Sequence, residues 1–179
     1  MEKSKENYVI RTAIITASDS GYAGERPRDI SGEVLRSMCE EAGMEIVHTI
    51  VLPDNRQMLA SEMKRICDEG IADLIFTTGG TGFSPRDWTP EATCDIAERM
   101  VNGIPTAMLV NSLKITPRAM LTRAVSAIRK KTLIINLPGS PKAVKENLEF
   151  LLPNIPHGIE MLLDLSHDCA GTGAKKSEK

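Results

Sequence analysis

Four short apolar segments alternate along the chain with longer segments whose apolar residues recur at helical spacing. The four short segments are rich in β-branched residues and occupy residues 8–16, 44–52, 72–77 and 132–137. Near-continuous apolar runs of this length are typical of strands that are buried on both faces. Strands that alternate with helices form a parallel sheet. The sequence therefore predicts an α/β fold, a three-layer sandwich in which a mostly parallel sheet carries helices on both faces.

The segments between these strands contain signals for helix starts. Thr89 is predicted to cap a helix with Pro90 at its first position, and Ser140 followed by Pro141 repeats this arrangement. We expect the first of these helices to continue as far as Met100. Other predicted helices begin near residues 29, 53 and 156, and the first two of them end at glycines.

The length of 179 residues is most simply one domain. We expect this domain to span residues 8–166, between a flexible N-terminus (1–7) and a flexible C-terminal tail (167–179). Hydrophobic residues make up 41% and charged residues 26% of the chain, which is ordinary for a soluble globular protein. No segment approaches the ~18 apolar residues of a membrane helix, and residues 1–7 lack the apolar core of a signal peptide.

Charge and cysteine content exclude some classes of function. A net charge of −2 and an aromatic content of 3% argue against bulk nucleic-acid binding. The four cysteines stand far apart without a CxxC pair, and the three histidines do not cluster. A zinc site is therefore not expected, and a reducing, cytoplasmic location is the better interpretation.

The third predicted strand leads directly into a glycine-rich loop, Gly79-Gly80-Thr81-Gly82, and then into a helix start. A strand, a glycine loop and a helix N-terminus in this order can form an anion pocket, because glycines let backbone N–H groups approach a phosphate closely. The alternative is an ordinary tight turn between strand and helix. The hydroxyl side chains near the loop, including Thr78 and Ser84, favour the phosphate site.

Polar residues also follow the other three predicted strands. Ser18 and Asp19 follow the first strand, Asp54 the second, and a Pro-Gly-Ser turn (138–140) the fourth. Structural alternatives remain: Ser18 and Asp19 are common turn formers, and Asp54 with Gln57 resembles a helix-capping box. Because parallel strands end at one edge of a sheet, we expect all four turns to converge there.

Residues 114–131 carry six positive charges and no acidic residue. In a chain of net charge −2 this concentration indicates either a local anion-binding field or a solvated helix face.

Three ordered blocks resemble the MogA/MoaB family of molybdenum cofactor biosynthesis, which includes the G domain of gephyrin. The blocks are TTGGTGFSPRD (77–87) with TPEA (89–92), PRAMLTR (117–123), and INLPGSPKAVKE (135–146). The resemblance extends over about residues 9–163, nearly the whole predicted fold.

The resemblance implies that molybdopterin is adenylylated by Mg-ATP, with release of pyrophosphate. The essential acids of the family correspond to Asp54 and Asp87, which we expect to hold or orient Mg²⁺ during catalysis. The resemblance also implies a homotrimer and a contact with the molybdenum insertion enzyme. The residues expected to bind substrate or phosphate are Ser18, Asp19, Thr78, Gly79, Gly80, Thr81, Gly82, Thr122, Pro138, Gly139, Ser140 and Lys142.

The chain departs from the family pattern after Val101, where the family commonly has a glutamate and an arginine. Thr106 and Leu109 occupy these positions. The loss of one charge of each sign is consistent with the loss of an ion pair. It also leaves open a second function, that of a MoaB-type protein that binds molybdopterin with little or no adenylyltransferase activity.

Overall fold

The computed structural model describes residues 8–165, and the predictions for the two chain ends lie outside this range. A six-stranded sheet forms its centre, with the strand order β2-β1-β3-β6-β5-β4. The strands are β1 (Arg11–Ala17), β2 (Glu45–Leu52), β3 (Leu74–Thr78), β4 (Arg99–Met100), β5 (Ser126–Arg129) and β6 (Thr132–Leu137). No helix in residues 8–165 is long and apolar enough to cross a membrane.

The predicted α/β sandwich is confirmed, and the four predicted strands form the parallel part of the sheet. β2, β1, β3 and β6 run parallel to their neighbours. The sequence did not predict β5 and β4, which add an antiparallel edge. The helix that we expected to reach Met100 ends at Ile96, where Ala97 turns extended and leads into β4.

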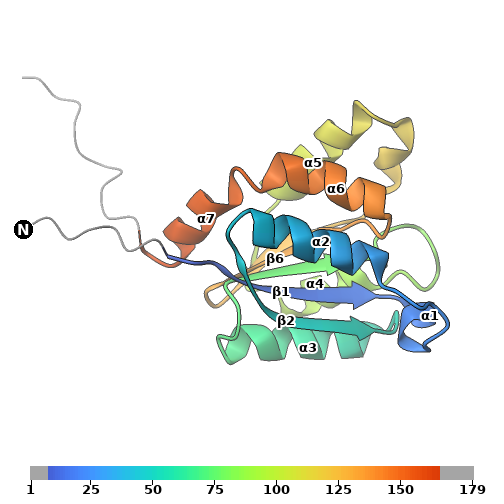
Figure 1. The fold of residues 1–179 in the computed structure, drawn as a ribbon, viewed down its shortest axis with the longest axis horizontal. Coiled ribbons are helices and arrows are strands. Elements are labelled where there is room, and N and C mark those ends of the chain that lie inside the picture. Colours follow the sequence, from blue (N-terminus) through green and yellow to red (C-terminus); the bar gives the residue numbers. More distant parts are fainter. Residues whose placement is uncertain (1–7, 166–179) are drawn as a thin grey trace, which may run out of the picture.

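Helices cover both faces of the sheet (Figure 1). The helices on one face belong to the same core cluster and are α2 (Ile30–Glu41), α5 (Gly103–Leu113), α6 (Pro141–Leu151) and α7 (Ile155–Leu162). The opposite face is covered by α3 (Arg56–Asp68) and α4 (Thr89–Ile96). Two short helices, α1 (Asp19–Tyr22) and the 3-10 helix η1 (Pro117–Leu121), lie outside these layers.

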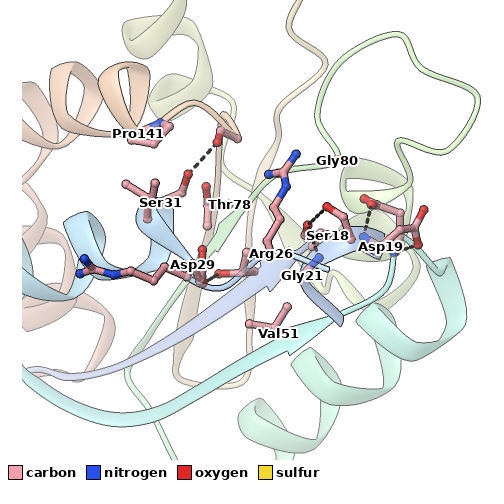
Figure 2. A pocket seen from close by; sticks show the side chains of 18 of the residues that line it. Ser18, Asp19, Gly21, Arg26, Asp29, Ser31, Val51, Thr78, Gly80 and Pro141 are labelled. Atoms are coloured by element: carbon pink, nitrogen blue, oxygen red, sulfur yellow. Dashed lines mark hydrogen bonds between the residues drawn. The ribbon is translucent and has the colours of Figure 1, made fainter. Parts of the chain in front are cut away.

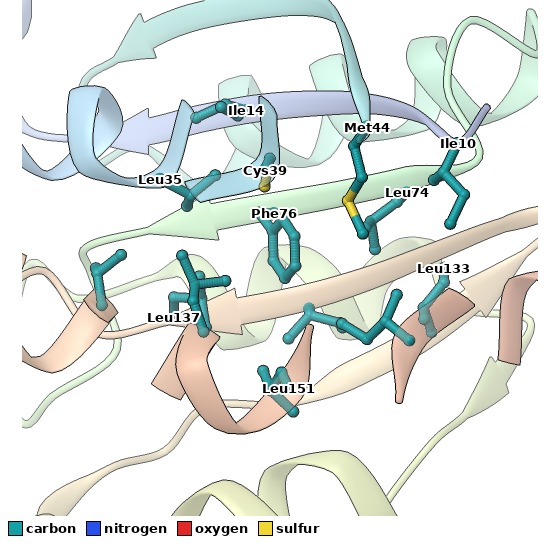
Figure 3. Packing of buried hydrophobic residues seen from close by; sticks show 14 of the residues in the cluster. Ile10, Ile14, Leu35, Cys39, Met44, Leu74, Phe76, Leu133, Leu137 and Leu151 are labelled. Atoms are coloured by element: carbon teal, nitrogen blue, oxygen red, sulfur yellow. The ribbon is translucent and has the colours of Figure 1, made fainter. Parts of the chain in front are cut away.

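Alternation along the strands divides the core into two clusters. Ile14, Phe76 and Ile135 pair across β1, β3 and β6 and face α2 and α6 (Figure 3). Their neighbours Ile75 and Ile134 face α3 and α4. Side chains of successive strand residues point to opposite faces, so a strand with helices on both sides must be apolar throughout.

One buried polar side chain connects the layers near the end of the sheet where the glycine loop leaves. Asn136 is fully buried and donates to Thr77 Oγ1 (3.0 Å) and to Thr93 Oγ1 (2.9 Å). Its Oδ1 accepts from the Val125 amide at 3.2 Å. Both the nitrogen and the oxygen of this side-chain amide have hydrogen-bond partners. Asn136 therefore holds β3, β6 and α4 together at low cost in free energy.

Candidate functional site

A cavity of about 810 Å³ opens at the C-terminal edge of the parallel strands. It is lined by turns that follow β1, β2, β3 and β6, including Ser18, Asp54, Gly80 and Gly139 (Figure 2). The four turns that the sequence predicted to converge therefore meet around one space. Asp19, Thr78, Gly79 and Asp87 are the other predicted site residues in its lining.

Asp19 and Asp54 hold the turns after β1 and β2 together. The Asp19 amide donates to Asp54 Oδ2 and the Asp54 amide donates to Asp19 Oδ1, both at 3.1 Å. Asp19 also forms an ion pair with Arg86 of the loop after β3, with 2.5 Å between Oδ2 and Nε. The hydrogen bond from Arg86 lowers the pKa of Asp19.

Asp54 is not a helix cap, so the capping-box alternative is wrong. The neighbouring Asn55 caps α3 by accepting from the Met58 amide at 3.0 Å. Burial raises the pKa of Asp54, and the negative charges of Asp19 and Asp87 raise it further. A carboxylate in this position is stabilised by a cation.

The glycine loop requires glycine at two positions. Gly79 and Gly80 have φ angles of +93° and +63°, and a Cβ on Gly79 would stand 2.3 Å from the Ala17 carbonyl oxygen. A Cβ on Gly80 would stand 2.5 Å from Thr89 Oγ1 and 3.0 Å from Asp54 Oδ1. The loop backbone thus approaches the carboxylate more closely than any other residue type allows.

The N–H groups of this loop are largely available for a ligand. The Gly79 amide donates to the Leu137 carbonyl at 3.3 Å. Within residues 8–165, the amides of Gly80, Thr81 and Gly82 have no hydrogen-bond acceptor. Of these three residues, Gly80 lines the large cavity, so its unpaired N–H group is placed to bind an anion there.

The expected cap at Thr89 is wrong. Thr89 is the first residue of α4, and its hydroxyl donates instead to the Gly79 carbonyl at 2.9 Å. Trp88 precedes the helix without a side-chain cap. The threonine therefore stabilises the glycine loop rather than the helix terminus.

Asp87 lies between the glycine loop and the start of α4. Its Oδ2 accepts from the Ser84 amide at 3.1 Å and would lie 2.9 Å from a Cβ on Gly82. Its carboxylate raises the pKa of Asp54, so the two predicted catalytic acids lie close enough to repel each other.

Arg123 binds the carbonyl groups of the glycine loop and does not line the large cavity. Its guanidinium donates to the carbonyl oxygens of Gly82 and Asp87, both at 2.6 Å, and pairs with Glu91 on α4. Its amide donates to the Thr81 carbonyl at 2.9 Å. This member of the basic stretch is therefore engaged within the protein, as is Arg129, which pairs with Asp68.

Several predicted site residues lie outside the large cavity. Thr122 and Pro138 line a second cavity of about 210 Å³. The next residue after Pro138, Gly139, lines the large cavity, so the two cavities adjoin at this turn. The Lys142 side chain is 81% exposed and stands 3.8 Å from Glu146. Thr81, Gly82, Ser140 and Lys142 line neither of the two cavities.

The structure also adds residues that the sequence reasoning missed. Asp29 caps α2 and accepts from Thr16 Oγ1 at 2.5 Å, and Ser31 donates to the Gly139 carbonyl at 2.7 Å. Arg26 projects into the cavity from the turn between α1 and α2 (Figure 2). The charged run Glu25-Arg26-Pro27-Arg28-Asp29 after the first strand was the available signal.

The arrangement fits a magnesium ion that is bound partly by substrate. Within residues 8–165, no group of three or more His, Cys, Asp or Glu side chains is arranged to hold a metal. Mg²⁺ in nucleotide sites typically takes one or two carboxylates and completes its shell with phosphate oxygens and waters. Asp54 and Asp87 could supply these carboxylates, since burial and mutual repulsion favour a cation beside Asp54.

Comparison with known proteins identifies the family. A family model described as a probable molybdopterin-binding domain matches residues 13–157. The molybdopterin adenylyltransferase of Helicobacter pylori strain J99 is 38% identical over 156 residues, which cover 86% of this chain and 88% of that protein. The chain belongs to the MogA/MoaB family.

Other members of the MogA/MoaB family agree in sequence and in fold. Gephyrin of Dictyostelium discoideum is 58% identical over 89 residues, which are 50% of this chain and 12% of that protein. The crystal structure of the molybdopterin biosynthesis enzyme MoaB from Thermus thermophilus superposes with a TM-score of 0.82 at 39% identity. The superposition covers 87% of this chain and 98% of that one.

The two departures from the family pattern lie on α5, outside the large cavity. The Thr106 hydroxyl donates to the Asn102 carbonyl of its own helix at 2.8 Å. Leu109 lines the smaller cavity. Neither position contributes to the lining that contains Asp54 and Asp87.

Proposed function

We infer that this protein is a molybdopterin adenylyltransferase of molybdenum cofactor biosynthesis. The observation that carries the proposal is the cavity at the sheet edge, which is lined by two acids, Asp54 and Asp87, and by Gly80, whose amide is unpaired within residues 8–165. The adenylyltransferases among its relatives, at 38–39% identity over most of the chain, support the same activity.

The proposed reaction uses ATP as co-substrate. An oxygen of the terminal phosphate of molybdopterin attacks the α-phosphorus of ATP, the bond from this phosphorus to the bridging oxygen breaks, and pyrophosphate leaves. Asp54 and Asp87 would hold Mg²⁺, which neutralises charge on the phosphates when bound. The amides of residues 80–82 would bind phosphate oxygens, and Arg123 keeps these amides in place.

Positioning of charged reactants is the main contribution of such a site. Phosphoryl-type transfer asks the protein for little covalent chemistry, so geometry and charge determine the rate. Thr122 and Pro138 line the adjoining small cavity and are candidates for contacts with the pterin substrate.

The proposal includes a homotrimer, a cytoplasmic location and delivery of the product to the molybdenum insertion enzyme. An apolar surface on α5 and η1 supports self-association, because patches of this kind mark interfaces. Its exposed side chains include Val110, Leu113, Ile115, Met120 and Leu121.

The function is tested with Asp87→Asn, which keeps the size of the side chain and removes its charge. Pyrophosphate release is measured with molybdopterin and Mg-ATP, and ligand binding is measured separately by calorimetry. We expect turnover to fall at least about a hundredfold. Asp95→Asn is the control, because Asp95 is an exposed acid of α4 that pairs with Arg56 outside the cavity.

Two outcomes would contradict the proposal in different ways. Turnover of Asp87→Asn within about tenfold of the wild type would remove the metal role of Asp87. Molybdopterin binding by the wild-type protein without pyrophosphate release would establish the other family function, that of a molybdopterin-binding protein.

A further inference from the structure

The large cavity contains more negative than positive charge. Four carboxylates line it, those of Asp19, Asp29, Asp54 and Asp87, against the guanidinium groups of Arg26 and Arg28. A substrate with several phosphate groups is strongly anionic, so this wall composition repels it unless cations compensate.

Most arginines near the cavity already have carboxylate partners. Arg28 makes two hydrogen bonds to Glu33, at 3.1 and 2.6 Å. Arg86 pairs with Asp19, and Arg123 pairs with Glu91. These three guanidinium groups therefore add little free positive charge to the cavity.

Arg26 differs from them. Its guanidinium has no hydrogen-bond acceptor and no carboxylate partner anywhere in residues 8–165, although its side chain projects into the cavity (Figure 2). It is thus the cavity-lining cation that remains available to a ligand.

The backbone at Arg26 is held in place. The amides of Glu25 and Arg26 both donate to the Ser20 carbonyl, at 2.9 and 3.3 Å. Pro27 follows, and a residue before proline is restricted to extended conformations. Asp29, two residues further on, is anchored as the cap of α2. The backbone position from which the Arg26 side chain extends is therefore fixed before a ligand binds.

We propose that Arg26 binds a phosphate group of the substrate. The planar guanidinium matches phosphate oxygens with two parallel hydrogen bonds. The amide of Gly80 and the acids Asp54 and Asp87, with their bound cation, would hold the phosphates on the side of β3, and Arg26 binds on the side of the α1–α2 turn. This assignment rests on the proposed function, and it adds to the predicted phosphate site a cation that lines the cavity.

The test compares Arg26→Gln and Arg26→Lys with the wild type by calorimetry, using Mg-ATP, AMP, pyrophosphate and molybdopterin as separate ligands. We expect Arg26→Gln to weaken binding of at least one ligand tenfold or more, and Arg26→Lys to retain part of it, since lysine keeps the charge without the fork. Arg65→Gln is the control for loss of one positive charge, because Arg65 pairs with Glu62 on α3, outside the cavity. Thermal melting checks that each variant is folded.

The set of ligands whose binding is weakened by Arg26→Gln identifies the phosphate group that Arg26 contacts. Weaker binding of Mg-ATP and pyrophosphate with unchanged AMP binding assigns Arg26 to the β- and γ-phosphates, and weaker molybdopterin binding assigns it to the pterin phosphate. Equal affinities, within about twofold of the wild type for every ligand, would overturn the proposal.

The failures of the two proposals are distinguishable. If the wild-type protein releases pyrophosphate and Arg26→Gln binds every ligand normally, only the role of Arg26 is wrong. If the wild type binds ligands through Arg26 but releases no pyrophosphate, only the enzymatic function is wrong. A wild-type protein that binds none of the four ligands would overturn both.

Discussion

Arg123 connects the stability of the glycine loop to the proposed activity. Its guanidinium joins the carbonyl oxygens of Gly82 and Asp87 to Glu91, so one side chain positions both ends of the segment that carries the loop amides and Asp87. Arg123→Lys keeps the positive charge, but lysine has no planar fork and can satisfy only some of these acceptors.

The expected loss of stability follows from these contacts. A hydrogen bond from a charged donor contributes about 1.5–3 kcal/mol, and both bonds to the loop carbonyls are short, at 2.6 Å. The pair with Glu91 is about one third exposed and adds at most about 1 kcal/mol. With one contact kept by lysine, the free energy of unfolding should fall by about 2–4 kcal/mol. In a chain of this size, the melting temperature then falls by roughly 5–15 °C.

Activity should fall further than stability alone explains. A displacement of about 1 Å at a catalytic group can reduce the rate about a hundredfold, and pyrophosphate release below the melting temperature measures this loss. Arg129→Lys is the matched control, because Arg129 also makes three side-chain hydrogen bonds, here two to a carboxylate (Asp68) and one to a carbonyl oxygen (Ile96), outside the cavity. We expect it to melt lower while its activity stays within about threefold of the wild type. If Arg123→Lys also keeps its activity within that range, Arg123 does not position the site.

Two further predictions concern titrating groups. Burial raises the pKa of Asp54 in the folded state, so its contribution to stability is largest at low pH and is lost as pH rises through that pKa. Asp54→Asn should therefore melt higher than the wild type at pH 7 in the absence of magnesium and lose this advantage below about pH 4, the ordinary aspartate pKa; a lower melting temperature at pH 7 would contradict the reasoning. Burial also raises the pKa of Cys39 to about 12 and of Cys67 to about 11. Both should resist iodoacetamide in the native protein and react after denaturation, as measured by peptide mass spectrometry; native labelling at the rate of a free thiol would refute this.

The sequence predicted the parallel strands well because burial on both faces leaves a plain signal. Ile14-Ile15 and Leu74-Ile75-Phe76 face helices on both sides and must be apolar throughout. The edge strands lack this signal. β4 has two residues, both exposed, and follows a helix without a glycine stop, so the pattern favoured continuation of the helix.

Candidate site residues were predictable where they directly follow a buried strand. Asp54 and the glycine loop were found in this way, because parallel strands end at the same edge. Arg26 follows a short helix instead, and no strand end marks it. Lys142 was expected to bind anions together with the Gly139-Ser140 helix start; its side chain is 81% exposed, and its role stays a prediction.

By itself, the sequence determined the parallel α/β sheet and the four turns at its edge, because these depend on local order and on the periodicity of apolar residues. The pair of acids among these turns came from the family resemblance. Only the tertiary structure decided which charges are free. Arg28, Arg86 and Arg123 find partners through contacts between separate turns and helices, whereas Arg26 does not within residues 8–165. The pairing of a long charged side chain depends on the groups that the fold brings within reach, and sequence spacing does not contain that information.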